Sequence, residues 1–73
     1  MKTGYWLPEY KKFLEKLIQA RKEAGLTQVE VAKKLVKPQS FIVKCEKGER
    51  RVDILELKRF SEIYNKPIDY FLE

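Results

Sequence analysis

The amino-acid sequence predicts an all-α protein of five short helices, and three observations support this prediction. Apolar residues recur at intervals of three and four along most of the chain, which is the spacing of amphipathic helices. Residues that favour the end of a helix, Gly25, Gly48 and Asn65, separate these stretches. Two stretches open on a capping-box pattern, at Thr27 and at Asp53. These signals give the bounds of the expected helices.

The first expected helix runs from Pro8 to about Ala24. Pro8 suits the first helical turn, because its φ is fixed and the amide hydrogen that it lacks would have no helical partner there. Residues 1–7 before it are expected to form a short N-terminal arm. The apolar face of this helix should pack on the next two helices, with Leu14, Leu17 and Ile18 set against Val31, Leu35 and Ile42.

Three aromatic residues near the N-terminus, Tyr5, Trp6 and Tyr10, allow two interpretations. They can cover the end of the hydrophobic core, which we favour. They can also form part of a dimer contact, because aromatic side chains are enriched in interfaces. An arm that enters a DNA groove is disfavoured, since Lys2 supplies its only charge.

Residues 27–48 are expected to form two helices joined by a tight turn. Thr27 and Glu30 complete the capping box of the first helix, because each side chain can bond the backbone amide of the other residue. Pro38 cannot continue the first helix but suits the first turn of the second, and Gly48 ends the second helix.

The second of these helices has two unlike faces. Ile42 and Cys45 fall on the apolar face, and Gln39, Ser40 and Lys44 fall on a polar one. The major groove of DNA is wide enough for one helix, and a helix in the groove presents its N-terminal residues to base edges. Glutamine can pair with adenine through two hydrogen bonds, and lysine can bond the acceptors of guanine. The polar face therefore predicts contacts to bases.

The last part of the chain is expected to add two helices. Asp53 and Glu56 form a capping box for a helix that ends at about Tyr64, and Pro67 prevents its continuation. One final helical turn is expected at residues 68–72. The side chains that should face the core are Leu57, Phe60, Ser61, Tyr64, Ile68 and Phe71.

Positive charge is concentrated around the two central helices. The protein carries a formal net charge of +5, and residues 33–51 contain seven basic residues and two acidic ones. This segment therefore accounts for the whole excess of positive charge. A basic patch that coincides with two such helices is the expected electrostatic footprint of phosphate binding. A solvated lysine-rich surface is the alternative interpretation of the charge alone.

Four short motifs lie in and around this segment: Gly25-Leu26-Thr27-Gln28, Val31-Ala32-x-x-Leu35, Pro38-Gln39-Ser40-x-Ile42 and Glu46-x-Gly48-x-Arg50. Together they resemble the helix-turn-helix domain of the Xre family, the Cro and phage-repressor type. The resemblance extends over roughly residues 13–71 and implies a lambda-repressor-like fold. It also implies a sequence-specific transcriptional regulator of prokaryotic or phage type, and we expect a repressor.

The resemblance implies base contacts at Gln39, Ser40 and Lys44, the positions that the polar face also indicates. Phosphate contacts are expected around them. Gln28 begins the first motif helix, where its amide can hold a phosphate, and its family counterpart contacts the DNA backbone. The remaining candidates are cations of the turn and of the loop after the second helix: Lys37, Lys47, Arg50 and Arg51.

Two positions depart from the usual pattern of the family. Val36 stands in the turn where glycine is usual, and a β-branched residue resists a positive φ. The turn is therefore expected to be strained or to have another shape. Val43 stands where a small polar residue is common, which should remove one DNA contact.

Three other side chains of the segment have interpretations of their own. Glu46 lies near a helix end, where an acid is disfavoured, and should bond a basic residue such as Arg21 or Arg51 in a structural role. Cys45 is expected to be a buried core residue and not a reactive thiol. Phe41 can meet a thymine methyl if it is exposed, or can pack under the turn.

The composition argues against several other classes of protein. With one cysteine and no histidine, neither an internal disulfide nor an ordinary zinc finger is expected, and no metal or other cofactor is predicted. No apolar run is long enough for a membrane span, and a cytoplasmic protein is expected. An enzyme is disfavoured, because the chain lacks a Gly-rich phosphate loop and an evident acid–base pair.

Double-stranded DNA is the expected partner of a single domain spanning residues 1–73. One such module makes a small interface, so we expect a homodimer on a palindromic site. The alternative is a protein-interaction module, such as an antitoxin or an anti-repressor that holds a second regulatory protein. The departures at Val36 and Val43 leave this alternative open, and the basic segment argues against it as the sole role.

Overall fold

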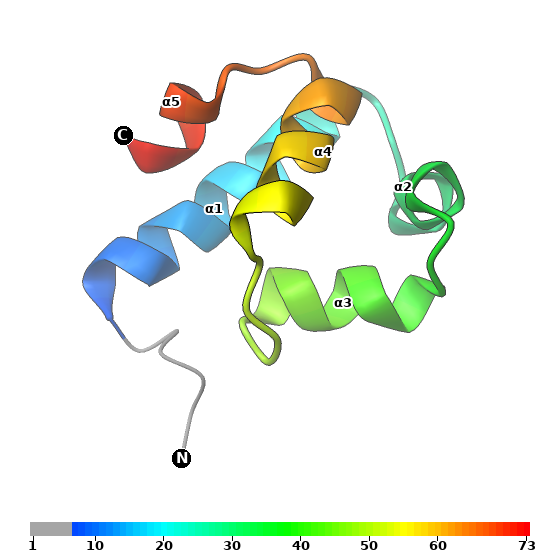
Figure 1. The fold of residues 1–73 in the computed structure, drawn as a ribbon, viewed down its shortest axis with the longest axis horizontal. Coiled ribbons are helices and arrows are strands. Elements are labelled where there is room, and N and C mark those ends of the chain that lie inside the picture. Colours follow the sequence, from blue (N-terminus) through cyan, green and yellow to red (C-terminus); the bar gives the residue numbers. More distant parts are fainter. Residues whose placement is uncertain (1–6) are drawn as a thin grey trace.

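The computed structural model describes residues 7–73, and these residues fold into five α-helices that confirm the predicted fold class. The helices are α1 Pro8–Glu23, α2 Gln28–Leu35, α3 Gln39–Lys47, α4 Ile54–Tyr64 and α5 Ile68–Leu72. In Figure 1, α1 and α4 cross near the centre, with α2 and α3 toward one side and α5 toward the other. None of these helices is long and apolar enough to cross a membrane.

Part of the expected N-terminal arm lies outside the described residues. This applies to residues 1–6, and therefore to the proposed roles of Lys2, Tyr5 and Trp6. Tyr10 is described. Its ring centroid lies 5.3 Å from that of Phe13, and its hydroxyl accepts a hydrogen bond from the Val52 amide at 3.2 Å. Tyr10 therefore covers one end of the core, as the favoured interpretation expects.

Both predicted capping boxes are present and fix the starts of α2 and α4. The Thr27 hydroxyl accepts from the Glu30 amide at 3.1 Å, and the Glu30 carboxylate accepts from the Thr27 amide at 2.8 Å. Asp53 and Glu56 make the same reciprocal pair at 2.8 and 3.0 Å. Each box satisfies two amides that a helix start would otherwise leave unpaired. Pro38 differs slightly from expectation, since it immediately precedes α3.

Three helices end on a residue in the left-handed conformation. These residues are Gly48 after α3 (φ 79°), Asn65 after α4 (φ 56°) and Val36 after α2 (φ 57°). Glycine and asparagine adopt this conformation at little cost, whereas a β-branched side chain is crowded in it. The turn between α2 and α3 therefore keeps the left-handed geometry and carries the expected strain at Val36.

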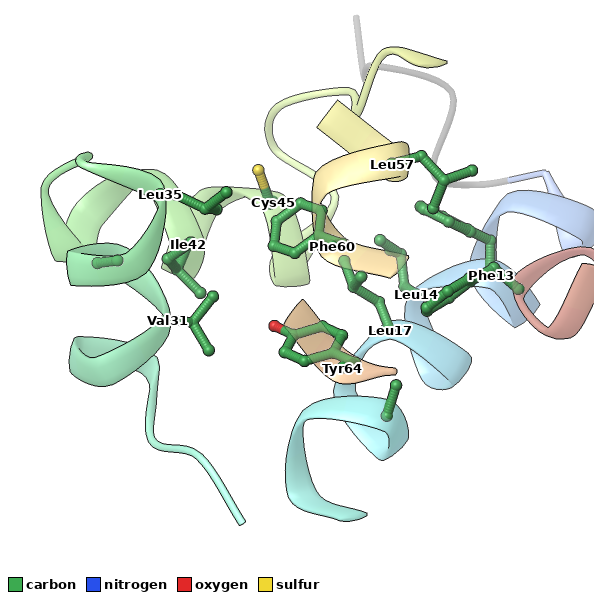
Figure 2. Close-up of a cluster of buried hydrophobic side chains, with 13 residues drawn as sticks. Phe13, Leu14, Leu17, Val31, Leu35, Ile42, Cys45, Leu57, Phe60 and Tyr64 are labelled. Atoms are coloured by element: carbon green, nitrogen blue, oxygen red, sulfur yellow. The ribbon is translucent and has the colours of Figure 1, made fainter. Parts of the chain in front are cut away.

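One hydrophobic core gathers side chains from all five helices. Figure 2 shows Phe60 and Tyr64 of α4 between the apolar side chains of α2 and α3 on one side and those of α1 on the other. Phe60 and Tyr64 stack with ring centroids 5.7 Å apart. The buried members are Phe13, Leu14, Leu17, Ala20, Val31, Ala32, Leu35, Ile42, Cys45, Leu57, Phe60, Tyr64 and Phe71.

The predicted position of Ile18 in this core is wrong. Its side chain is only partly buried and lies at the surface beside Glu15, Gln19 and Lys22. Ala20 is fully buried on the inward face of α1. The 3.6-residue period explains the correction, because the stripe that includes Leu17 and Ala20 turns the intervening position away from α2 and α3.

Candidate nucleic-acid interface

The α2–turn–α3 unit presents one polar face to solvent. α2 and α3 pack closely on each other, and α3 runs along one edge of the molecule in Figure 1. Ile42 and Cys45 are completely buried, whereas Gln39, Ser40 and Lys44 are exposed. The apolar side of α3 is thus fixed in the core. The three polar side chains face solvent from its outer side.

A buried carboxylate holds this unit against α1. Glu46 of α3 is only 7% exposed, and its Oε2 atom accepts from Arg21 Nε of α1 at 2.7 Å. Its Oε1 atom accepts from Arg21 Nη2 at 3.2 Å, which completes a two-point ion pair. Arg21 Nη1 also donates to the Leu26 carbonyl at 3.1 Å. Hydrogen bonding to Glu46 raises the pKa of Arg21, so the guanidinium is charged at neutral pH.

The structural partner expected for Glu46 is therefore Arg21. The same carboxylate also binds Gln28, whose Nε2 atom donates to Glu46 Oε1 at 3.0 Å. Gln28 lies at the first position of α2, so one carboxylate joins α1, α2 and α3. A side-chain amide nitrogen carries two hydrogens, and this contact uses one of them. The predicted phosphate-contacting position therefore also has a structural contact, which leaves its second amide hydrogen unused by Glu46.

Cations surround the outer face of α3. Lys37 is exposed in the turn before the helix, Lys47 is exposed in its last turn, and Arg51 is exposed in the loop that follows. Lys33 and Lys34 add positive charge to the last turn of α2. The predicted basic segment is therefore a surface feature that flanks the polar face at both ends of α3.

Phe41 agrees better with the second interpretation, in which the side chain packs under the turn. The side chain is partly buried and packs against the core from the first turn of α3. Lys37 Nζ lies 5.3 Å and Arg50 Cζ lies 4.6 Å from the centroid of its ring. Both distances are within the range of cation–π attraction. Phe41 therefore joins the turn before α3 to the loop after it.

A family model described as helix-turn-helix matches residues 17–71, which is well over half of the chain. The chain belongs to the Xre family of helix-turn-helix regulators. The five helices are those of a lambda-repressor-like fold, as predicted. Members of this family are DNA-binding regulators and are typically not enzymes. No curated protein and no solved structure matched the chain.

In this Xre-family protein, Arg50 has partners that the sequence did not indicate. Its Nη1 and Nη2 atoms donate to Oε1 and Oε2 of Glu56, both at 2.8 Å, and Nη1 also donates to the Arg51 carbonyl at 2.8 Å. The hydrogen bonds between the two side chains lower the pKa of Glu56 and raise the pKa of Arg50. The capping-box pattern identified Glu56 as a helix cap only, because nothing local in the sequence points to a second partner six residues away.

Cys45 is a buried core thiol in the same region. Burial raises its pKa to about 11, which keeps the thiol protonated at neutral pH. A protonated and inaccessible thiol is a poor nucleophile. This environment agrees with the predicted structural role.

Proposed function

We propose that this protein is a transcriptional repressor that binds double-stranded DNA sequence-specifically as a homodimer. In this proposal α3 enters the major groove. The main observation in support of this proposal is that α3 has one face buried in the core and one exposed face with three hydrogen-bonding side chains. The base contacts come from Gln39, Ser40 and Lys44, and the phosphate contacts come from Gln28, Lys37, Lys47, Arg50 and Arg51.

The positions of the charged and polar side chains support this assignment of base contacts and phosphate contacts. Uncharged donors and acceptors in the first turn of α3 suit base edges, which offer both kinds of group in the major groove. Cations at the ends of α3 suit the phosphates that border the groove. Arg50 is the exception, because its charge already faces Glu56.

Exposed apolar side chains support the proposed homodimer. Ile54 and Leu55 are 69% and 70% exposed in the first turn of α4, and Leu72 is 69% exposed in α5. Leu72 borders a shallow apolar depression that Leu7 and Val52 also line. Burial of such surface between two copies is favourable. A two-fold dimer of one-domain chains would place two recognition helices on half-sites about one helical turn apart.

Selection of bound sequences from a pool of random duplex DNA tests this proposal. An enriched inverted repeat with half-sites roughly one helical turn apart is the expected result. Weak, salt-sensitive binding without any enriched motif would contradict it, because such binding is only electrostatic. That outcome would favour the protein-interaction role, in which the domain holds a second regulatory protein.

The proposed function also implies a cytoplasmic location. A repressor of prokaryotic or phage type acts on the chromosome, which lies in the cytoplasm.

Two substitutions separate base contacts from phosphate contacts. Gln39→Ala should relax the preference at one base pair of each half-site, at a cost of about 1–3 kcal/mol for each half-site on the preferred sequence. Lys47→Ala should weaken binding to all sequences alike and reduce the magnitude of the slope of log K against log salt by about 0.9 for each subunit, or about 1.8 for the homodimer. Titrations on the selected and a scrambled duplex at several salt concentrations measure both effects. An unchanged base preference in Gln39→Ala would refute the assignment of α3 as the recognition helix.

A further inference from the structure

Phe41, Arg50 and Glu56 form a continuous chain of contacts between α3 and α4, which we call the Arg50 brace. Glu56 lies in the first turn of α4 and holds the Arg50 guanidinium through two parallel hydrogen bonds of 2.8 Å. The guanidinium lies 4.6 Å from the centroid of the Phe41 ring, in the first turn of α3. The brace therefore reaches the part of α3 that carries Gln39 and Ser40.

Backbone contacts fix the position of the brace on both sides. The amides of Glu49 and Arg50 donate to the Lys44 carbonyl at 3.0 and 3.2 Å, which folds the loop back on α3. Glu56 Oε1 also accepts from the Asp53 amide at 3.0 Å, as part of the α4 capping box. Each end of the brace is thus attached to a helix end, and movement of the guanidinium would break its contacts with Glu56, the Arg51 carbonyl and the Phe41 ring.

The charge of Arg50 is already compensated in this arrangement. Both Glu56 carboxylate oxygens face the guanidinium, and a two-point arginine–carboxylate pair is among the stronger charged hydrogen-bond geometries. A phosphate could take over these two hydrogen bonds only by displacing the carboxylate. Lys47, in the last turn of α3, is exposed to solvent. The four ion pairs found among the described residues do not include it.

We propose that Arg50 is a positioning residue of the DNA-binding site and that it acts by holding Phe41, and with it the first turn of α3, at the angle required for base reading. This inference rests on the proposed function and revises one residue of it, because Arg50 was expected to bind a phosphate. In this role the arginine stays on Glu56 in the DNA complex. Glu56 is then required for base reading although it is an acid beside a polyanion.

The substitution Glu56→Gln distinguishes the two roles by the sign of its effect. Glutamine also serves at this position of a capping box, so the start of α4 is preserved. If Arg50 binds a phosphate and Glu56 restrains it, the variant frees the arginine, binding becomes tighter and its salt dependence steepens. If Arg50 is a brace, the variant loosens Phe41. Binding to the selected site then weakens by about twofold to fivefold for each bound subunit, the size expected for one well-formed ion pair near the surface.

Glu30→Gln is the matched control for this variant. It makes the same change at the same position of the other capping box, in α2, and removes the same charge. The Glu30 carboxylate accepts from the Thr27 amide, so no arginine contact is altered. The affinity difference between the two variants therefore reports the Arg50 contact, and not the loss of a negative charge or a weaker cap.

Arginine variants give a second, independent comparison. Arg50→Ala should weaken binding to the selected duplex and leave the slope of log K against log salt at the wild-type value, whereas Lys47→Ala reduces the magnitude of that slope by about 0.9 for each subunit. Arg50→Lys should not restore affinity, because lysine keeps the charge but cannot make the two-point pair. The double variant Arg50→Ala/Glu56→Gln should lose no more affinity than Arg50→Ala alone, since both changes break one contact chain.

NMR spectra of the DNA-free protein test the brace separately from the proposed function. Glu56→Gln should shift the Phe41 ring protons and the amides of residues 39–41, and Glu30→Gln should leave them in place. If these resonances do not move in Glu56→Gln, or if this variant binds DNA more tightly than Glu30→Gln does, the proposal is overturned. If the wild-type protein selects no DNA sequence while the resonances shift as expected, the proposed function fails and the brace stands as an α3–α4 contact.

Discussion

At the scale of single residues, Val36 shows a conflict between side chain and backbone. Its φ and ψ of 57° and 49° are left-handed, and its side chain is 85% exposed, so almost no packing compensates for the conformation. A left-handed conformation costs an ordinary L-residue about 1–2 kcal/mol. The helix-turn-helix therefore retains its turn because α2 and α3 pack on each other and on the core, and this packing outweighs the local strain.

Val36→Gly should stabilise the protein by about 0.5–1 kcal/mol, because relief of the strain exceeds the extra entropy of glycine in the unfolded chain. Urea denaturation measures the change in the free energy of unfolding. Asn65→Gly is the matched control, since Asn65 has nearly the same φ and ψ, 56° and 47°. Asparagine tolerates this conformation, so the control should gain less. A destabilised Val36→Gly would mean that the valine side chain contributes packing that its exposure does not suggest.

Cys45 should react with thiol reagents only when the protein unfolds. Its side chain has no exposed area, and burial raises its pKa to about 11. At pH 8 the native thiol should therefore react at least about a hundredfold more slowly than the thiol in denaturant, because both access and ionisation are suppressed. A colorimetric thiol assay with and without urea measures this ratio. Equal rates under both conditions would show that the α3 face is not stably buried.

At the scale of helices, the Glu46 carboxylate fixes the mutual arrangement of α1, α2 and α3. It accepts hydrogen bonds from Arg21 and Gln28, which lie on two different helices. Apolar packing alone allows helices to slide by small amounts, whereas these directed bonds define one arrangement. The angle at which α3 is presented therefore depends on a polar contact inside an otherwise apolar interface.

Glu46→Gln should lower the free energy of unfolding by about 2–3 kcal/mol, because it leaves the Arg21 guanidinium largely buried without its counter-charge. Thermal and urea denaturation measure the loss. Glu23→Gln is the control: its carboxylate pairs with Lys66 at 2.7 Å, but at the surface, where an ion pair contributes little. The control should unfold close to the wild-type midpoint. Similar midpoints for Glu46→Gln and Glu23→Gln would show that the buried pair does not orient the helices.

For the molecule as a whole, the ionisation of several carboxylates makes the free energy of unfolding depend on pH. Hydrogen bonds to Arg50 lower the pKa of Glu56 below its ordinary value of 4.5. The pKa of Glu23 is lowered mainly by Lys66, and that of Glu30 by the Thr27 amide. A carboxyl group whose pKa is lower in the folded state stabilises that state while it is ionised. The contribution is complete above the unfolded-state pKa.

The free energy of unfolding should therefore be nearly constant from pH 7 down to about pH 5 and should fall as the pH drops through the lowered pKa values of the folded state. The net positive charge rises over the same range and adds repulsion in the same direction. Urea titrations at a series of pH values between 7 and 2 measure the curve. Glu56→Gln should flatten part of it. A protein that becomes more stable between pH 5 and pH 3 would contradict these pKa shifts.

The local features of the fold were predictable from the sequence. Capping boxes, left-handed helix ends and apolar spacing each depend on residues within one or two turns of each other, so their partners are visible in the sequence itself. Even the strain at Val36 followed from its place in the turn. The division of α3 into buried and exposed faces was predictable for the same reason.

The contacts between helices were only partly predictable. Arg21 was one of two candidates for Glu46, and the choice required the fold, because the two residues lie 25 positions apart. The predicted packing of Ile18 was wrong, because the positions of α2, α3 and α4 decide which face of α1 is turned toward the core. Nothing in the sequence indicated that Glu56 would hold Arg50 as well as cap its own helix.

Short-range hydrogen bonds and periodicity encode the five helices, the helix-turn-helix and the family, so these features could be predicted from the amino-acid sequence. The tertiary structure alone decided which side chains share a partner: Gln28 with Arg21 on Glu46, and Arg50 between Phe41 and Glu56. The physical reason is that a charged side chain binds whichever opposite charge or ring the packed helices bring within a few ångströms. That proximity follows from the packing of the core, which no single segment of the chain specifies.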